Sequence, residues 1–206
     1  MVMDNNWNDL VSEFTKLGGV AENIFQKEGE LGRGIFPIDP KKKAKIYTPS
    51  ELMIGREDVY LEDKKVRIKK EKDYKNEIRE FFTFYQDNFS WGVGGKHTHE
   101  EFEHGLKSFP SELKDILKSN GIIDIEQRYN TDFEKVVFNQ FLKARAFEFR
   151  NKPVIVPFLE LVNYSPKSLP LIKEENGIRH PDILLGYKEI THKYSISSPL
   201  FRWASV

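Results

Sequence analysis

The stretch 158–168, FLELVNYSPKS, decides how the chain is interpreted. It closes an apolar run that begins at Val154 and carries one carboxylate, Glu160. The run stops at Asn163-Tyr164-Ser165-Pro166, and Asn, Ser and Pro are residues typical of turns. A buried strand or helix is therefore predicted to end here. Its last polar residues form either a simple turn or the edge of a binding pocket.

Length and composition narrow the class of protein. The 206 residues predict one large domain or a domain with an insertion. Lys plus Arg and Asp plus Glu both total 32, and this balance argues against nucleic acid or an anionic membrane as partner. There is no Cys, which excludes disulfides and thiolate chemistry. No apolar run approaches the ~18 residues of a membrane span, and no signal peptide opens the chain. We expect a soluble, intracellular, cytoplasmic protein.

Hydrophobic spacing predicts a mixed α+β fold. Helices are expected over 5–17, where Trp7, Leu10, Val11 and Phe14 share a stripe, and over 75–89 and 132–149. A further helix is expected over 109–121, with Leu113, Ile116 and Leu117 as its apolar face. Short apolar runs flanked by Gly and Pro predict strands between 20 and 54, and strand-like sequence returns at 152–164 and 182–195. The order suggests a first β block (1–55), a helical insert (56–150) and a second β block (151–206).

Several familiar motifs are absent. WGVGGKHT (91–98) lacks the spacing and the hydroxyl residue of a phosphate-binding loop. His97, His99 and His104 lack the four-residue spacing that places two zinc ligands on one helix face, so no metal site is predicted. No Gly-x-Ser-x-Gly elbow of a serine hydrolase is present.

Three separated segments, taken in their order and spacing, are more specific evidence for function than any single motif. They are LGRGIFPID (31–39), ARAFEFRNKPVIVPFLELVNYSP (144–166) and GYKEITHKYS (186–195), where Tyr194 closes a strand. In the first, Gly32-Arg33-Gly34 leaves main-chain groups uncovered by bulky side chains, so a small polar ligand can approach them. A tight hairpin would use the same glycines.

This ordered set resembles the SET-domain protein lysine methyltransferases, in the branch typified by the plant Rubisco large-subunit methyltransferase. The resemblance covers roughly residues 7–206. It implies a split SET-type β fold, with short strands in small sheets and an inserted helical subdomain. It further implies S-adenosylmethionine as cofactor and, as partner, a protein substrate with a target lysine.

Site residues follow from the resemblance position by position. It implies that Tyr194 is catalytic, at the methyl-transfer centre, and that Arg145 and Glu160 contact the substrate. The residues implied in cofactor binding are Leu31, Gly32, Arg33, Gly34, Asn163 and Tyr164.

Three features depart from the family pattern. Tyr164 stands where the family has His, Glu160 stands where it has Asp, and the chain stops at SPLFRWASV, where the family continues. These departures favour an alternative, a catalytically inactive SET-like scaffold that binds proteins.

Overall fold

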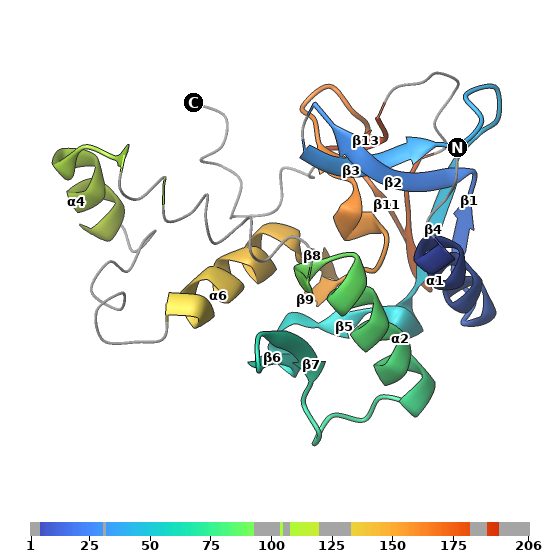
Figure 1. The fold of residues 1–206 in the computed structure, drawn as a ribbon, viewed down its shortest axis with the longest axis horizontal. Coiled ribbons are helices and arrows are strands. Elements are labelled where there is room, and N and C mark those ends of the chain that lie inside the picture. The colour runs from blue at the N-terminus through green and yellow to red at the C-terminus, as the bar shows by residue number, and fades with distance from the viewer. Residues whose placement is uncertain are drawn as a thin grey trace.

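The computed structural model describes residues 5–30, 32–92, 104, 108–119, 133–181 and 189–193 (Figure 1). The α-helices are α1 (Asn5–Lys16), α2 (Asn76–Asn88), α4 (Ser111–Ser119) and α6 (Phe133–Arg145). Three short 3₁₀ helices are η1 (Ser50–Leu52), η2 (Arg56–Asp58) and η3 (Leu159–Leu161). The strands are β1 (Val20–Glu22), β2 (Ile24–Gly29), β3 (Gly32–Pro37), β4 (Lys45–Pro49), β5 (Ile54–Gly55), β6 (Val59–Glu62), β7 (Lys65–Ile68), β8 (Phe147–Phe149), β9 (Lys152–Ile155), β10 (Asn163–Tyr164), β11 (Ile172–Glu174), β12 (Gly177–Arg179) and β13 (Thr191–His192).

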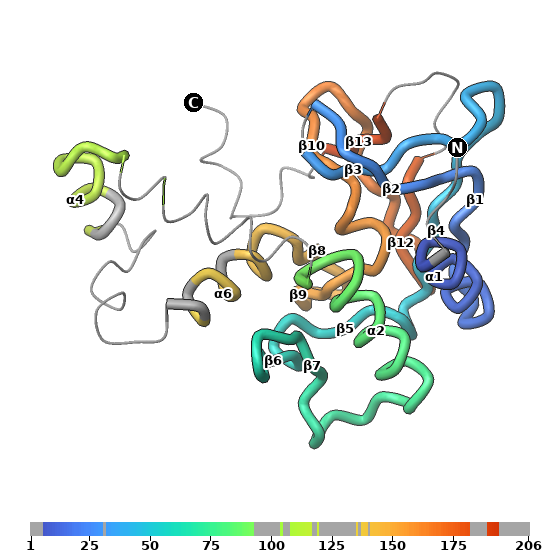
Figure 2. Tube along the Cα trace, viewed as in Figure 1, coloured from blue at the N-terminus to red at the C-terminus, as the bar shows by residue number. Residues whose placement is uncertain are grey.

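The strands form several small sheets, which confirms the predicted α+β class. One antiparallel sheet has the order β1-β4-β12-β11, and another has the order β5-β9-β8. β2 with β3 and β6 with β7 form hairpins, whereas β10 and β13 pair in parallel. Both larger sheets join strands from the first part of the chain to strands from its last part (Figure 2).

Helices α1 and α2 pack against each other through aromatic side chains, as their spacing predicts. Trp7, Leu10 and Phe14 are buried on α1, and the helix gives way to Gly18 at a φ of 91°. Phe14 stacks on Phe81 of α2, with ring centroids 5.8 Å apart. The period of 3.6 residues therefore identified the inner face of both helices.

Phe158 lies at the centre of this core. Its side chain is fully buried, and its ring centroid is 4.3 Å from that of Phe14 and 5.5 Å from that of Trp7. Its φ of 65° is rare for a bulky residue, so packing holds the backbone in a strained conformation. The chain turns sharply here from β9 towards η3.

That turn corrects one expectation. The apolar run 154–162 is not one strand or one helix, because β9 ends at Ile155 and η3 begins at Leu159. Pro157 lies at the break, where it has no N–H to offer a sheet ladder. Asn163 consequently opens a new short strand rather than ending a long one.

The elements within residues 56–150 also differ from the predicted helical insert. α6 ends at Arg145, and residues 147–149 form a strand whose Phe147 and Phe149 are buried on one face. The β6–β7 hairpin lies inside the range predicted as a helical insert. On α4, Ile116 is 56% exposed although its spacing indicated a buried face. The boundaries of the three predicted parts remain a prediction.

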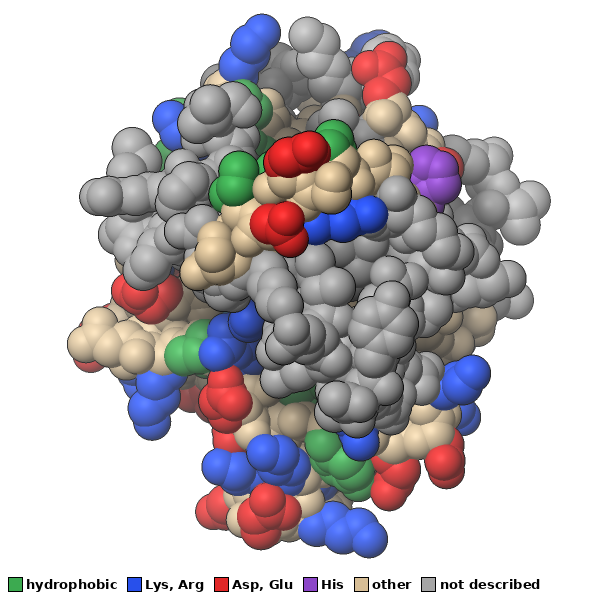
Figure 3. Space-filling model, turned by 90° about the vertical axis from the view of Figure 1, so that its left-hand side faces the viewer, with side chains coloured by type: hydrophobic (Ala, Val, Ile, Leu, Met, Phe, Trp, Pro, Cys, Tyr) green, Lys and Arg blue, Asp and Glu red, His purple; other side chains and the backbone are tan. Residues whose placement is uncertain are grey.

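Surface charges of both signs are interspersed over the described part of one face (Figure 3). Among the described residues, none of the helices combines the length and the apolar character needed to cross a membrane.

Candidate functional site

The glycine-rich segment forms the tight β2–β3 hairpin. Gly29 pairs with Gly32 at the end of the hairpin, and Gly32 has a φ of 85°, which favours glycine. Gly34 needs the absence of a side chain for another reason. A Cβ there would overlap a carboxylate oxygen of Glu189 and approach Nδ2 of Asn163 to 2.9 Å.

Asn163 joins this hairpin to the last part of the chain. Its Nδ2 donates to the main-chain oxygen of Arg33 at 3.2 Å and to Oε1 of Glu189 at 2.6 Å. Both partners only accept, so they fix the orientation of the amide. The structure thus brings together Arg33, Gly34 and Asn163, which the resemblance implied in cofactor binding, and adds Glu189. We call these four residues the Asn163 cluster.

Backbone pairing holds the cluster in register. The main-chain N–H of Ile190 donates to the oxygen of Ile35 at 2.8 Å, which fixes Glu189 beside β3. In the parallel β10–β13 pair, Asn163 lies opposite Thr191 and Tyr164 lies opposite His192. Side chains alternate along a strand, so Tyr164 faces away from Asn163, and it is 42% exposed.

His192 is the buried titratable group nearest to this pairing. Its ring is 1% exposed and lies 5.4 Å from the ring of Phe147, measured between centroids. Burial lowers the pKa of His192 from 6.5 to about 4. The imidazole is therefore neutral in the folded protein at neutral pH.

Glu160 and Arg145, the predicted substrate residues, also meet, but in the interior. The Glu160 carboxylate accepts from Nε2 of Gln86 at 3.0 Å, and the Arg145 guanidinium donates to the main-chain oxygen of Glu160 at 2.9 Å. Arg145 also lies over the ring of Phe141, 4.7 Å from its centroid.

Burial sets the ionisation of this second group. It raises the pKa of the Glu160 carboxyl, against the opposing charge of Arg145 and a hydrogen bond with Tyr85. The pKa of Tyr85 is raised well above its usual value, first by burial and then by the Glu160 charge. We call Tyr85, Gln86, Arg145 and Glu160 the Glu160 cluster. Its observed partners come from α2 and α6, and a role in binding substrate stays a prediction.

Glu189 is the residue that sequence reasoning missed. It lies within the segment GYKEITHKYS, where it is one polar residue in a strand-like pattern. A single carboxylate inside a strand-like pattern does not indicate a site. Its place beside Gly34 depends on long-range pairing that no local pattern encodes.

Two predicted site residues, Leu31 and Tyr194, lie outside the described residues. Within the described part of the chain, no group of three or more His, Asp and Glu side chains is arranged to hold a metal ion.

No protein-family model matches the sequence, and no curated protein matches it. Among solved structures, the chain is similar to the structure of Rubisco LSMT bound to AdoMet, with a TM-score of 0.45 and 13% identity over 95% of this chain and 54% of that one. It is also similar to the SET domain of LSMT bound to lysine and AdoHcy, with a TM-score of 0.43 and 12% identity over 93% and 54% of the two chains. The chain thus spans about half the length of the structures it matches.

Proposed function

We propose that this chain is an S-adenosylmethionine-dependent methyltransferase that acts on a lysine side chain of a protein substrate. The observation that carries the proposal is the Asn163 cluster. There, segments that contain Arg33, Asn163 and Glu189 meet within hydrogen-bonding distance. The sequence resemblance assigned the first two of these segments to the cofactor.

The chemistry of the cluster fits the amino-acid end of that cofactor. The Glu189 carboxylate and the Arg33 carbonyl are acceptors, and an ammonium group offers three donors and a positive charge. Gly34 keeps a Cβ away from the same place. In the proposed site Asn163 positions the carboxylate, and Glu189 pairs with the ammonium group of the ligand.

When bound, S-adenosylmethionine supplies a sulfonium methyl group: the lysine nitrogen forms a bond to the methyl carbon, the carbon–sulfur bond breaks with its electron pair left on sulfur, and a lysine proton passes to water. Positioning dominates such an in-line displacement. The attacking lysine must be neutral although its ordinary pKa is ~10.4. We assign Tyr194 the role of orienting that amine.

A second candidate function is a SET-like binding domain without transferase activity. The interior position of Glu160 and the exposed side chain of Tyr164 favour it, because both residues were expected at the ligand. This scaffold would keep the Asn163 cluster only as a link between hairpin and strand.

Calorimetric titration of the chain with S-adenosylmethionine tests the proposal. We expect saturable one-to-one binding, followed by transfer of a tritiated methyl group from the cofactor to a protein substrate. If the folded chain shows no heat of binding at millimolar ligand, the methyltransferase proposal is wrong and the scaffold is favoured. Binding without transfer to any protein in a proteome-wide assay would also favour the scaffold.

A further inference from the structure

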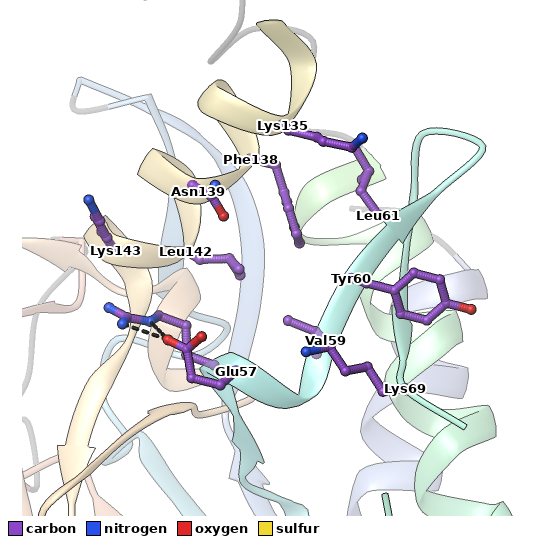
Figure 4. Close-up of a pocket in the computed structure, with 11 residues that line it drawn as sticks. Glu57, Val59, Tyr60, Leu61, Lys69, Lys135, Phe138, Asn139, Leu142 and Lys143 are labelled. Carbon is purple, nitrogen blue, oxygen red and sulfur yellow. Dashed lines mark hydrogen bonds and ion pairs between the residues drawn. The ribbon is translucent and has the colours of Figure 1, made fainter. Parts of the chain in front are cut away.

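A hollow of about 540 Å³ lies between α6 and β6 (Figure 4). This volume falls within the range of ligand pockets in proteins. The wall is partly apolar, because Val59, Phe138 and Leu142 line it and are themselves at least 90% buried. Figure 4 shows Phe138 and Leu142 pointing from α6 towards β6. An apolar side chain of a ligand could pack against these buried residues.

One face of α6 supplies most of the helical wall. The lining residues from this helix are Lys135, Phe138, Asn139, Leu142 and Lys143. Their spacing of three and four places them on one stripe. Phe138 and Leu142 form its inner edge, and the two lysines are exposed at the rim.

The charged residues around the hollow are mostly basic. Among the described residues that line it, they are Arg56, Lys69, Lys135 and Lys143, against the single carboxylate of Glu57. Glu57 already accepts two hydrogen bonds from the Arg56 guanidinium, at 2.7 and 3.0 Å. The rim is therefore locally positive on a chain whose formal net charge is zero. Charge complementarity points to an acidic ligand.

The separation of the lysines selects the kind of acid. Lys135 and Lys143 both belong to α6, and their Cα atoms are ~12 Å apart along the axis at 1.5 Å per residue. Two carboxylates held at a similar separation would each lie beside one of these lysines. An extended peptide with acidic residues four positions apart spans ~13 Å, and the residue midway between them points to the same side.

We propose that this hollow is a docking site for an acidic segment of a partner protein. The segment has the pattern acid–x–apolar–x–acid and lies extended along α6. Its carboxylates meet the lysines at the rim, and its central apolar side chain packs on Phe138 and Leu142. No residue of the Asn163 cluster lines the hollow, so this site does not depend on the proposed methyl transfer.

Fluorescence anisotropy with a labelled peptide tests the proposal. The probe is fluorescein-GESLSEG, and its control, fluorescein-GQSLSQG, has the same shape without charge. We expect the folded chain to bind the acidic probe at least ~10-fold more tightly than the control at low salt, because only the acidic probe forms ion pairs with the two lysines at the rim. Added salt should remove the difference.

Matched variants distinguish binding in the hollow from a general effect of the protein's net charge on the acidic peptide. Lys135→Glu/Lys143→Glu should abolish the preference for the acidic probe. Lys41→Glu/Lys152→Glu makes the same change of net charge at exposed positions outside the hollow and should keep the preference. Asn163→Ala should also keep it. Equal binding of the two peptides to the unmodified chain overturns the proposal, as does an undiminished preference in the Lys135/Lys143 variant.

Discussion

The Asn163 and Glu160 clusters differ in burial and in bonding partners, although only Leu161 and Val162 lie between Glu160 and Asn163 in the sequence. The Glu160 side chain is 6% exposed and bonds to Gln86 of α2, so its partners are structural. Asn163 is half-buried and bonds to a hairpin and to Glu189 at the edge of β13. After the turn at Phe158, the short helix η3 points the Glu160 side chain into the core, whereas Asn163, just beyond η3, is half-buried. Nearness in sequence therefore does not give two polar residues the same role.

The largest effect is expected from Glu160→Ala, which should lower the free energy of unfolding by about 3–5 kcal/mol. The loss leaves Gln86 and Tyr85 without their buried acceptor and Arg145 without a nearby countercharge. Urea denaturation measures it.

Two controls sharpen this result. Glu148→Ala should change stability by less than ~1 kcal/mol, because Glu148 is exposed and its pair with Lys173 is a long surface contact of 3.7 Å. Glu160→Gln should cost less than Glu160→Ala because it keeps the shape and loses only a charge that burial disfavours. A neutral effect of Glu160→Ala would contradict a structural role for the Glu160 cluster.

Lower pH should destabilise the protein through His192, whose folded pKa of about 4 lies below its ordinary 6.5. Between these values His192 is protonated in the unfolded chain and neutral in the folded chain. The free energy of unfolding therefore falls as the pH falls from about 6.5 to about 4. The shift corresponds to about 3 kcal/mol. Glu160 acts in the opposite sense, since its raised pKa makes stability fall as pH rises through the folded value.

The contribution of His192 is isolated by comparing denaturation at several pH values in the unmodified chain and in His192→Gln. The variant should have a shallower decline between pH 6.5 and 4. Parallel curves would show that His192 is not held neutral by burial.

Glu189→Gln should weaken binding of S-adenosylhomocysteine about 10-fold, because it removes the charge that pairs with the ammonium group in the proposed site. Binding of 5′-methylthioadenosine, which has no amino-acid end, should be unchanged. Calorimetry with both ligands gives the comparison. Equal weakening of both would mean that Glu189 only supports the fold, and absence of binding in the unmodified chain would instead contradict the cofactor.

The smallest effect on stability is expected from Gly34→Ala. The new Cβ would meet the end of the flexible Glu189 side chain, which can move away, so stability should change by less than ~1 kcal/mol. Binding of S-adenosylhomocysteine should nonetheless weaken, because the displaced carboxylate leaves Asn163. Gly18→Ala is a control for backbone strain alone, because φ is positive there and a new Cβ would make only an ordinary contact with Cγ of Pro49 at 3.9 Å.

The sequence predicted the parts of this molecule that depend on local periodicity. The buried stripes of α1 and α2 follow from 3.6-residue spacing, and the hairpin glycines follow from turn chemistry. The break at Phe158 could not be predicted, because its strained backbone is held by ring contacts with residues more than a hundred positions earlier. The position of Glu189 could not be predicted for the same reason, since long-range strand pairing brings it beside Gly29 and Gly34.

We propose that Asn163, and not Glu160, belongs to the cofactor site. The most direct test is the dissociation constant of S-adenosylmethionine for the unmodified chain, Asn163→Ala and Glu160→Gln, each confirmed to be folded by circular dichroism. We predict that Asn163→Ala weakens binding at least ~10-fold while Glu160→Gln leaves it within about 2-fold. Unchanged affinity in Asn163→Ala, or a larger loss in Glu160→Gln, would mean that Asn163 does not hold the cofactor as proposed.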